Sequence, residues 1–533
     1  MSLRSPYPDV EIPEVSLPEL LFGAGFGDRA DAPAVVDGST GAAVTFAQLD
    51  AMVDRIAAAL HGRGLRRGDV VALFAPNSPT WVAVFHGVLR ANGVVTSANS
   101  LYSPTELAHQ LADSGARMLV TASPFVDRAT AAAASAGLPA DAVVTLDPVD
   151  GHISLADLLS STAEPPVLEV GPTDTAVLPY SSGTTGLAKG VILTHRNLVA
   201  NLLQLAPVAT TDETTRVLAV LPFFHIYGMT VLMNHSLHRR ATVVTMPRFE
   251  MAEFLRVVTQ YRLNRLYIAP PIAVGLAKHP LVDEHDLSCV DVVFSGAAPL
   301  DAELGHAVAR RLGCVVLQGY GMTELSPVSH SMDERRPNDD LNGVGYALPN
   351  VESKLVDAET GREVGPGERG ELWVRGPNVM SGYLNNPAAT AATLDADGFL
   401  HTGDVATVDE NGYFRIVDRL KELIKYKGYQ VPPAELEALL LTHEDIADVA
   451  VIGVRDPEGE EVPKAFVVRR DGAGLTADDV MTYVAERIAP HKKVRVVEFI
   501  DRIPKSASGK ILRKELRARE SVAAEGRAAP GIR

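Results

Sequence analysis

The stretch Pro179–Val191, PYSSGTTGLAKGV, decides how the rest of the chain is interpreted. It contains two serines, two threonines, three glycines and one lysine, and it follows the short apolar run Thr175–Leu178. The chain becomes apolar again at Val191–Leu193. This order predicts a strand that opens into a glycine-rich loop with many hydrogen-bond donors, followed by a second strand.

A loop of this composition suits a phosphate group. Glycines let the main chain approach an anion closely, and hydroxyls and free N–H groups donate hydrogen bonds to its oxygens. The loop is not a Walker A motif, because Ala188 stands where that motif needs its second glycine. Taken alone, the same composition is also typical of a flexible surface turn, so both interpretations stay open at this point.

Composition limits the class of protein. With 533 residues, 46% of them hydrophobic, the chain is long enough for two or more domains with large cores and is not disordered. The formal charge of −17 argues against a general surface for nucleic acid or anionic membrane. We therefore expect no nucleic-acid partner and no stable membrane association. The oligomeric state cannot be read from the sequence.

The cellular compartment follows from what the sequence lacks. Cys289 and Cys314 are its only cysteines, too few for a disulfide framework. The first twenty residues show no basic segment followed by an apolar one, and no apolar run reaches the length of a membrane span. These features predict a cytoplasmic protein.

The order of apolar runs predicts an α/β fold. After an irregular beginning over residues 1–40 and a helix over 45–60, strand-like runs alternate with helical stretches such as Met251–Tyr261, which is typical of parallel sheets. The predicted strands are 70–74, 118–120, 143–145, 217–221, 241–245, 265–269, 290–294 and 315–317. Beyond residue 340, short strands and turns predict a β-rich subdomain.

The last hundred residues alternate again and have the size of a small α+β domain. We predict a large N-terminal domain of parallel and mixed sheets with helices over 1–418, a hinge at 419–421, a small mobile C-terminal domain over 422–520 and a frayed tail over 521–533.

Further motifs accompany the opening loop. Some follow predicted strands, at the sheet edge where parallel α/β sheets bind ligands. They are LPFFHIYG at 221–228, SGAAP at 295–299, QGYGMTE at 318–324, TGD at 402–404, DRLKELIKYKGYQ at 418–430 and PKSASGK at 504–510.

In this order and spacing, the motifs resemble those of the acyl-adenylate-forming superfamily, which includes acyl-CoA synthetases, adenylation domains and luciferase. The chain looks most similar to 4-coumarate/cinnamate:CoA ligases, and the resemblance extends from about residue 25 to 517. It implies a reaction in two steps. A carboxylic acid attacks the α-phosphate of ATP to give an acyl-adenylate and pyrophosphate, and the thiol of CoA then displaces AMP to give a thioester.

The resemblance also implies roles for individual residues, with ATP, Mg²⁺ and CoA as cofactors. Lys510 would bridge carboxylate and phosphate in step one, Thr323 would bind the α-phosphate, and Glu324 would help to place Mg²⁺. His225 belongs to the same catalytic set, and Lys425 and Gln430 would serve step two or the adenylate. The nucleotide and CoA contacts would come from Ser181, Ser182, Gly183, Thr184, Thr185, Lys189, Gln318, Gly319, Tyr320, Asp404, Arg419, Lys421, Lys427, Gly428 and Arg248. Without the resemblance, Lys421, Lys425 and Lys427 would be read as a charged helix face.

The acid pocket implied by the resemblance contains Phe294 where coumarate-type plant enzymes typically carry a lysine. A phenyl ring offers a para-hydroxyl no partner, so we expect cinnamate-like acids to be preferred and hydroxylated ones tolerated. Simple core packing of Phe294 is the alternative. The pocket would be lined by Tyr227, Thr230, Ile268, Phe294, Ala297, Gly319, Gly321, Pro327 and Val328.

Three other functions stay open at this point. The activated group could pass to a carrier protein, an amine or nitrite instead of CoA, since step one is shared. The acid could be a medium-chain fatty acid. A non-catalytic nucleotide-binding protein is the third alternative, against which the intact set of Lys510, Glu324 and Asp404 argues.

Overall fold

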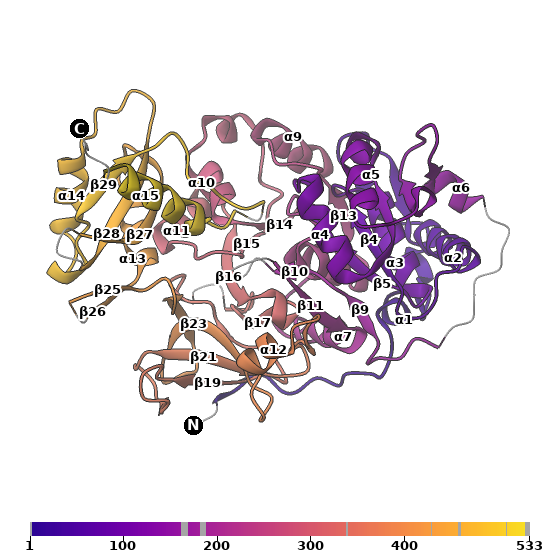
Figure 1. The fold of residues 1–533 in the computed structure, drawn as a ribbon, viewed down its shortest axis with the longest axis horizontal. Helices are drawn as coiled ribbons and strands as arrows, with labels where there is room; N and C mark the ends of the chain where they lie inside the picture. Colours follow the sequence, from indigo (N-terminus) through magenta and orange to yellow (C-terminus); the bar gives the residue numbers. More distant parts are fainter. Residues whose placement is uncertain are drawn as a thin grey trace, which may run out of the picture.

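The computed structural model describes residues 3–160, 169–181, 188–336, 339–427, 429–456, 460–507 and 509–527, with side chains up to residue 520. Its centre consists of two mixed sheets (Figure 1). Their parallel strands are short apolar runs, as β4 (Val70–Phe74) shows, all five residues of which are buried. Burial on both faces explains why these strands read as continuous apolar runs rather than as alternating ones.

The first sheet has the strand order β10-β11-β9-β5-β4-β6-β7-β8, with β22 paired to β11. The strands from β9 to β8 along this order pair in parallel, and β10, β11 and β22 add an antiparallel edge. Its strands are β4, β5 (Val94–Ser97), β6 (Ala116–Thr121), β7 (Val143–Thr145), β8 (Ile153–Ser154), β9 (Thr175–Val177), β10 (Tyr180–Ser181), β11 (Lys189–Thr194) and β22 (Gly382–Tyr383).

The second sheet has the order β18-β17-β16-β15-β14-β12-β13-β2-β3. It is parallel from β16 to β2, and its outer strands are antiparallel. Its strands are β2 (Pro33–Asp37), β3 (Ala43–Thr45), β12 (Arg216–Ala219), β13 (Thr242–Thr245), β14 (Arg265–Ile268), β15 (Val292–Ser295), β16 (Val315–Gly321), β17 (Val328–Ser331) and β18 (Tyr346–Ala347).

Helices cover these sheets. They include α9 (Met251–Tyr261), which has the predicted bounds, and a π-helix, η4 (Tyr227–His235). The other helices of this part are α1 (Leu17–Phe22), α2 (Phe46–Gly62), α3 (Pro79–Arg90), α4 (Pro104–Ser114), α5 (Val126–Ser135), α6 (Leu155–Leu159), α7 (His195–Gln204), α8 (Ser236–His238), α10 (Pro270–Lys278), α11 (Ala302–Leu312) and α12 (Pro387–Thr393).

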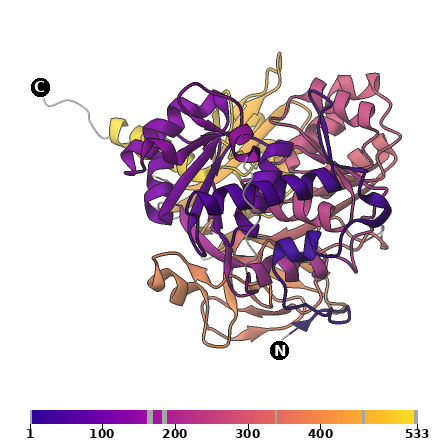
Figure 2. The same cartoon turned by 90° about the vertical axis from the view of Figure 1, so that its right-hand side faces the viewer.

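The β-rich subdomain is an antiparallel sheet in the order β1-β19-β21-β23-β24, with β20 paired to β19, at the bottom of both views (Figures 1 and 2). Its first strand is the N-terminal segment of the chain, which Figure 2 shows beside the subdomain. The strands are β1 (Leu3–Arg4), β19 (Glu352–Val356), β20 (Glu363–Val364), β21 (Gly370–Arg375), β23 (Leu400–Val408) and β24 (Phe414–Arg419).

The last part of the chain contains its own hydrophobic clusters, one of them around Ile424, Leu436 and Val451. A hairpin of β25 (Ile424–Tyr426) and β26 (Tyr429–Val431) precedes a sheet of β27 (Ile446–Arg455), β28 (Glu461–Arg469) and β29 (Val496–Phe499). The helices here are α13 (Pro433–Leu441), α14 (Ala477–Ala485) and α15 (Arg513–Arg527). The predicted α/β architecture, with a large N-terminal part and a smaller C-terminal one, is confirmed.

Three details differ from the sequence prediction. Residues 1–40 are not merely irregular, because β2 pairs in parallel with β13 and α1 packs on the core, two contacts that are too distant in sequence to leave a local signal. The lysines at 421, 425 and 427 do not share a helix face, because β25 and the turn after it lie there. Helix α15 extends to Arg527, so the first part of the predicted tail over 521–533 is helical, and its fraying stays a prediction.

Candidate active site

The candidate site lies where β14, β15 and β16 end. These neighbouring parallel strands bring three segments to one edge: Ala269–Pro271 after β14, the 295–299 turn after β15, and Gly319–Gly321 at the end of β16. Such an edge suits ligand binding because side chains and loops from several strands converge there. The short helix η6 (Thr323–Leu325) follows directly and carries Thr323 and Glu324.

Glu324 is a buried carboxylate, 5% exposed, and is held by hydroxyl groups. Its Oε1 accepts hydrogen bonds from Ser181 Oγ at 3.1 Å and from Tyr383 Oη at 2.8 Å. Lys189 Nζ lies 4.1 Å from the centre of the Tyr383 ring. The two strands that flank the glycine-rich loop, β10 and β11, thus bring Ser181 to the carboxylate and Lys189 to the ring of Tyr383. Ser182, Gly183, Thr184 and Thr185 lie outside the described residues.

A second buried carboxylate, Asp404, lies on β23 and is 5% exposed. The hydroxyl of Tyr320 donates to its Oδ2 at 2.6 Å, and Arg419 Nε lies 3.4 Å from its Oδ1. Arg419 ends β24, which pairs with β23 and places these two residues opposite each other. The sequence prediction had all three residues contacting the nucleotide, and here one hydrogen bond and one ion pair join them at Asp404.

Lys510, from the C-terminal part, is close enough to both carboxylates for their charges to act on it, without an ion pair to either one. Burial and the nearby charge of Arg419 lower the pKa of Lys510 from 10.5 to about 8, against the opposing effect of Asp404 and Glu324. The preceding Gly509 has φ +82°, and a Cβ there would lie 3.3 Å from Ala269 and Pro271. A glycine is therefore required for the Lys510 loop to pack this closely on the end of β14.

His225 lies beside Lys510 in the loop before η4. Its Nδ1 accepts a hydrogen bond from the main-chain N–H of Tyr227 at 3.3 Å. Burial, and then the Lys510 charge, lower the pKa of His225 to about 4, so the ring is neutral at pH 7. Because Nδ1 accepts, the neutral ring carries its proton on Nε2, where it can donate a hydrogen bond without adding charge to the site.

Three of the residues predicted to line the acid pocket, Tyr227, Gly319 and Val328, lie next to Phe294. The hydroxyl of Tyr227 donates to the Phe294 carbonyl at 3.3 Å. A Cβ at Gly319 would lie 2.8 Å from Phe294 Cζ, and one at Gly296 would lie 2.9 Å from the Tyr227 ring. The glycines therefore leave the space that these two rings occupy. Of the other predicted pocket residues, Thr230, Ile268 and Val328 are buried, Ala297 has φ +70°, and the Pro327 carbonyl lies against Gly321.

Several predicted residues lie elsewhere. The side chain of Gln318 is buried and hydrogen-bonded to the main chain of Leu300 and Leu341, so it fixes that turn. Lys425 and Gln430 are register partners in the β25–β26 hairpin, and both are exposed. The other exposed residues of the predicted set are Arg248, Ala297, Gly321, Lys421 and Lys427, while Gly428 lies outside the described residues.

Other residues at the site gave no sequence signal. Tyr383 comes from a two-residue strand, and only its pairing with β11 brings it to Glu324. A small cavity of ≈ 20 Å³ adjoins Phe294 and Val328 and is also lined by His235 and Glu334. Within the described ranges no group of three acidic, histidine or cysteine side chains is arranged to hold a metal ion. Glu324 alone suits a magnesium ion that takes its remaining ligands from phosphate and water. No helix in those ranges has the length and apolarity to cross a membrane.

Comparisons with known proteins agree with this arrangement. The model of the AMP-binding enzyme family matches residues 26–384, and that of the AMP-binding enzyme C-terminal domain matches residues 435–510. A 4-coumarate–CoA ligase of Oryza sativa subsp. japonica is 42% identical over 527 residues, with 97% of each chain covered. One from Arabidopsis thaliana is 41% identical, with 97% of this chain and 94% of the relative covered.

Solved structures give the same result. ATP-bound MatB from Rhodopseudomonas palustris has a TM-score of 0.84 and 31% identity, with 95% of this chain and 99% of that one covered. An anthranilate CoA ligase in complex with anthranoyl-AMP has a TM-score of 0.88 and 26% identity, with 97% and 99% covered. The resemblance inferred from the motifs is confirmed: the chain belongs to the AMP-binding enzyme family.

Proposed function

We propose that this protein is an ATP-dependent acid:CoA ligase that forms an acyl-adenylate and then an acyl-CoA thioester. The observation that carries the proposal is the packing of the Lys510 loop, from the C-terminal part, on the end of β14, where a Cβ at Gly509 would lie 3.3 Å from Ala269 and Pro271. A cation brought to this sheet edge suits a reaction in which a carboxylate must approach a phosphate, because both reactants are anions. The similar proteins reported above are named as CoA ligases.

The residues then have distinct roles in step one. Lys510 would neutralise charge between the acid carboxylate and the α-phosphate, and Thr323 would donate to that phosphate. The hydroxyl-held carboxylate of Glu324 would bind Mg²⁺, which supplies charge neutralisation at the phosphates. Asp404, held by Tyr320 and Arg419, would accept hydrogen bonds from the ribose hydroxyls.

Step two requires a different arrangement of the two parts. In the present one Lys510 occupies the site, while Lys425 and Gln430 are exposed on the β25–β26 hairpin. We place the hinge at Arg419–Lys421, so that rotation would withdraw Lys510 and bring the hairpin to the adenylate. Lys427, Gly428 and Arg248 would then contact CoA. The enzyme would work in the reducing cytoplasm, which fits its two free cysteines.

The acid would be a cinnamate-like aryl acid. Phe294 and Tyr227 give the pocket aromatic surfaces, and Phe294 has no group to pair with a para-hydroxyl. An apolar surface rejects an added hydroxyl by about a hundredfold at most, so 4-hydroxycinnamate would be tolerated.

A competition experiment tests this proposal. Purified protein is incubated with Mg-ATP, CoA and equal amounts of cinnamate and 4-hydroxycinnamate, and both adenylates and both thioesters are quantified by mass spectrometry. We expect cinnamoyl-CoA to dominate. A dominant 4-hydroxycinnamoyl-CoA would contradict the role of Phe294 but not the ligase. Adenylates without thioesters would identify an acceptor other than CoA, and no adenylate from either acid would refute the aryl-acid assignment.

A further inference from the structure

The π-helix η4 connects the candidate acid pocket to the cavity behind Phe294. Tyr227, Val231 and His235 are spaced four residues apart on it, which places them near one face of a helix this wide. Tyr227 contacts Phe294 in the acid pocket, whereas Val231 and His235 line the cavity. The same face therefore leads from the pocket into the cavity.

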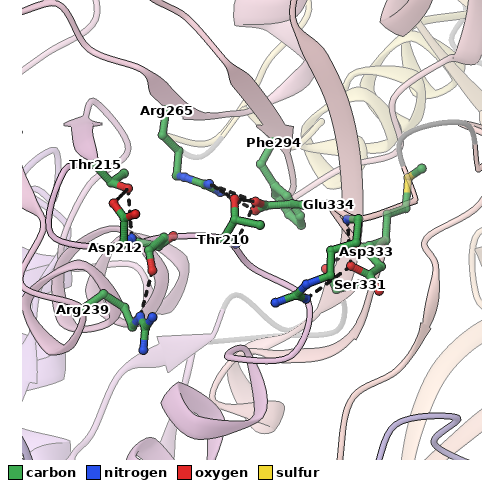
Figure 3. A network of polar contacts seen from close by, with 12 residues as sticks. Thr210, Asp212, Thr215, Arg239, Arg265, Phe294, Ser331, Asp333 and Glu334 are labelled. Carbon is green, nitrogen blue, oxygen red and sulfur yellow. Dashed lines mark hydrogen bonds and ion pairs between the residues drawn. The ribbon is translucent and has the colours of Figure 1, made fainter.

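Phe294 separates the two spaces. Its ring edge lies against Gly319 of the acid pocket, and its ring also lines the cavity, 5.9 Å from the centre of the Tyr267 ring. Figure 3 shows Phe294 beside Glu334, which contributes a carboxylate to the same cavity. With Phe294 in this position the cavity of ≈ 20 Å³ has room for about one water molecule.

His235 is the unusual residue of this cavity. It is 1% exposed, and neither ring nitrogen makes a hydrogen bond of good geometry with any described residue. The Leu202 carbonyl lies near the ring and favours a proton on it. Burial, and then the charges of His238, Arg265 and Arg239, lower the pKa of His235 to about 3, so the ring is neutral. A neutral imidazole that directs its N–H toward Leu202 retains one nitrogen as an acceptor without a donor.

Two other polar side chains of the cavity, Glu334 and Ser331, are already paired. Glu334 accepts from Arg265 Nη2 at 2.9 Å and from the Thr210 N–H at 2.8 Å, as Figure 3 shows in part. Ser331 donates to the Met332 carbonyl at 2.8 Å. Because Arg265 and Glu334 neutralise each other, the surroundings favour a neutral donor, such as a hydroxyl, over a second carboxylate.

We propose that the acid site has a second, polar compartment beyond Phe294, in which His235 accepts a hydrogen bond from a hydroxyl at the far end of the acid. Phe294 closes this compartment in the wild type and keeps the enzyme selective for shorter, apolar acids. Phe294 is thus the specificity-determining residue, and His235 recognises a hydroxyl only where the Phe294 side chain no longer blocks it. This inference rests on the proposed function.

A double-mutant cycle tests the proposal. The ratio of kcat/KM for 4-hydroxycinnamate to that for cinnamate is measured in the wild type, Phe294→Ala, His235→Leu and the double variant. We expect Phe294→Ala to raise this ratio about threefold to tenfold, the range expected for one neutral hydrogen bond. Adding His235→Leu should abolish the gain, whereas His235→Leu alone should change the wild-type ratio little. Phe294→Val replaces Phe294→Ala if the latter does not fold.

Asn234→Leu, alone and in the Phe294→Ala background, is the matched control. Asn234 is also fully buried, and its amide has no hydrogen-bond partner among the described side chains and main chain, but it does not line the cavity. It should leave the ratio unchanged. Equal ratios in Phe294→Ala and the double variant, with cinnamate still activated, would overturn the compartment while leaving the ligase intact. If the wild type activates neither acid, both the compartment and the aryl-acid assignment are refuted.

Discussion

Replacing Lys510 by arginine should remove the alkaline limit of adenylate formation. In this structure the pKa of Lys510 falls from 10.5 to about 8, chiefly through burial. At 1.36 kcal/mol per pKa unit, this lowering of the Lys510 pKa means that the site disfavours the charged form by about 3 kcal/mol relative to water. Because the pKa is lowered, the side chain is charged below about pH 8 and neutral above it. If step one needs the cation, its rate should fall about tenfold per pH unit above pH 8. An arginine stays charged throughout this range and should abolish the fall.

The assay is ATP–pyrophosphate exchange from pH 6 to pH 10, at constant ionic strength and with subsaturating ATP, so that kcat/KM reports the free enzyme. Lys510→Ala should lose about a hundredfold to a thousandfold at pH 7, the range for removing one transition-state donor. Thioester formation from a preformed acyl-adenylate and CoA serves as the control and should be retained in both variants. If Lys510→Arg keeps the same alkaline fall, another group is responsible and the reasoning is refuted.

Three further predictions follow from single contacts. Tyr320→Phe removes a hydrogen bond of 2.6 Å to the Asp404 carboxylate and should raise the KM for ATP about tenfold. The midpoint of thermal unfolding should not fall, and an unchanged KM would contradict the role of this pair. Gly319→Ala places a Cβ 2.8 Å from Phe294 Cζ and 3.1 Å from the His330 carbonyl, and this crowding should lower kcat/KM for the aryl acid about tenfold. Gly62→Ala is the control and should have no effect, because a Cβ at Gly62 would have no neighbour within 4 Å. Arg265→Met leaves Glu334 buried without its cation and should cost about 3–5 kcal/mol in urea unfolding, and the double variant Arg265→Met/Glu334→Leu should recover much of it. Burial acts to raise the pKa of the Glu334 carboxyl, but the hydrogen bond and charge of Arg265 lower it below its unfolded value. The pair therefore stabilises the fold above the carboxyl's unfolded pKa, and this stability should be lost as the pH falls through the folded pKa.

The sequence by itself determined the class of fold and the family. Strands such as Val70–Phe74 are short, continuous and apolar because both of their faces are buried, so their signal is local. The glycine-rich loop, the QGYGMTE segment and the PKSASGK segment were each identifiable because phosphate chemistry needs a particular set of residues within a few positions. Lys510, Glu324 and Asp404 were named as site residues only through the resemblance of the ordered motifs to the family.

Only the tertiary structure decided which side chains meet. Tyr383 reaches Glu324 across 59 positions, and Tyr320 reaches Asp404 across 84, distances at which no periodic pattern connects two residues. The parallel pairing of β2 with β13 was missed for the same reason. His235 and Glu334 gave no signal in the sequence, and only folding places them in one cavity with Phe294. Whether the buried ring of His235 finds a hydrogen-bond partner depends on the packed interior and not on the order of residues along the chain.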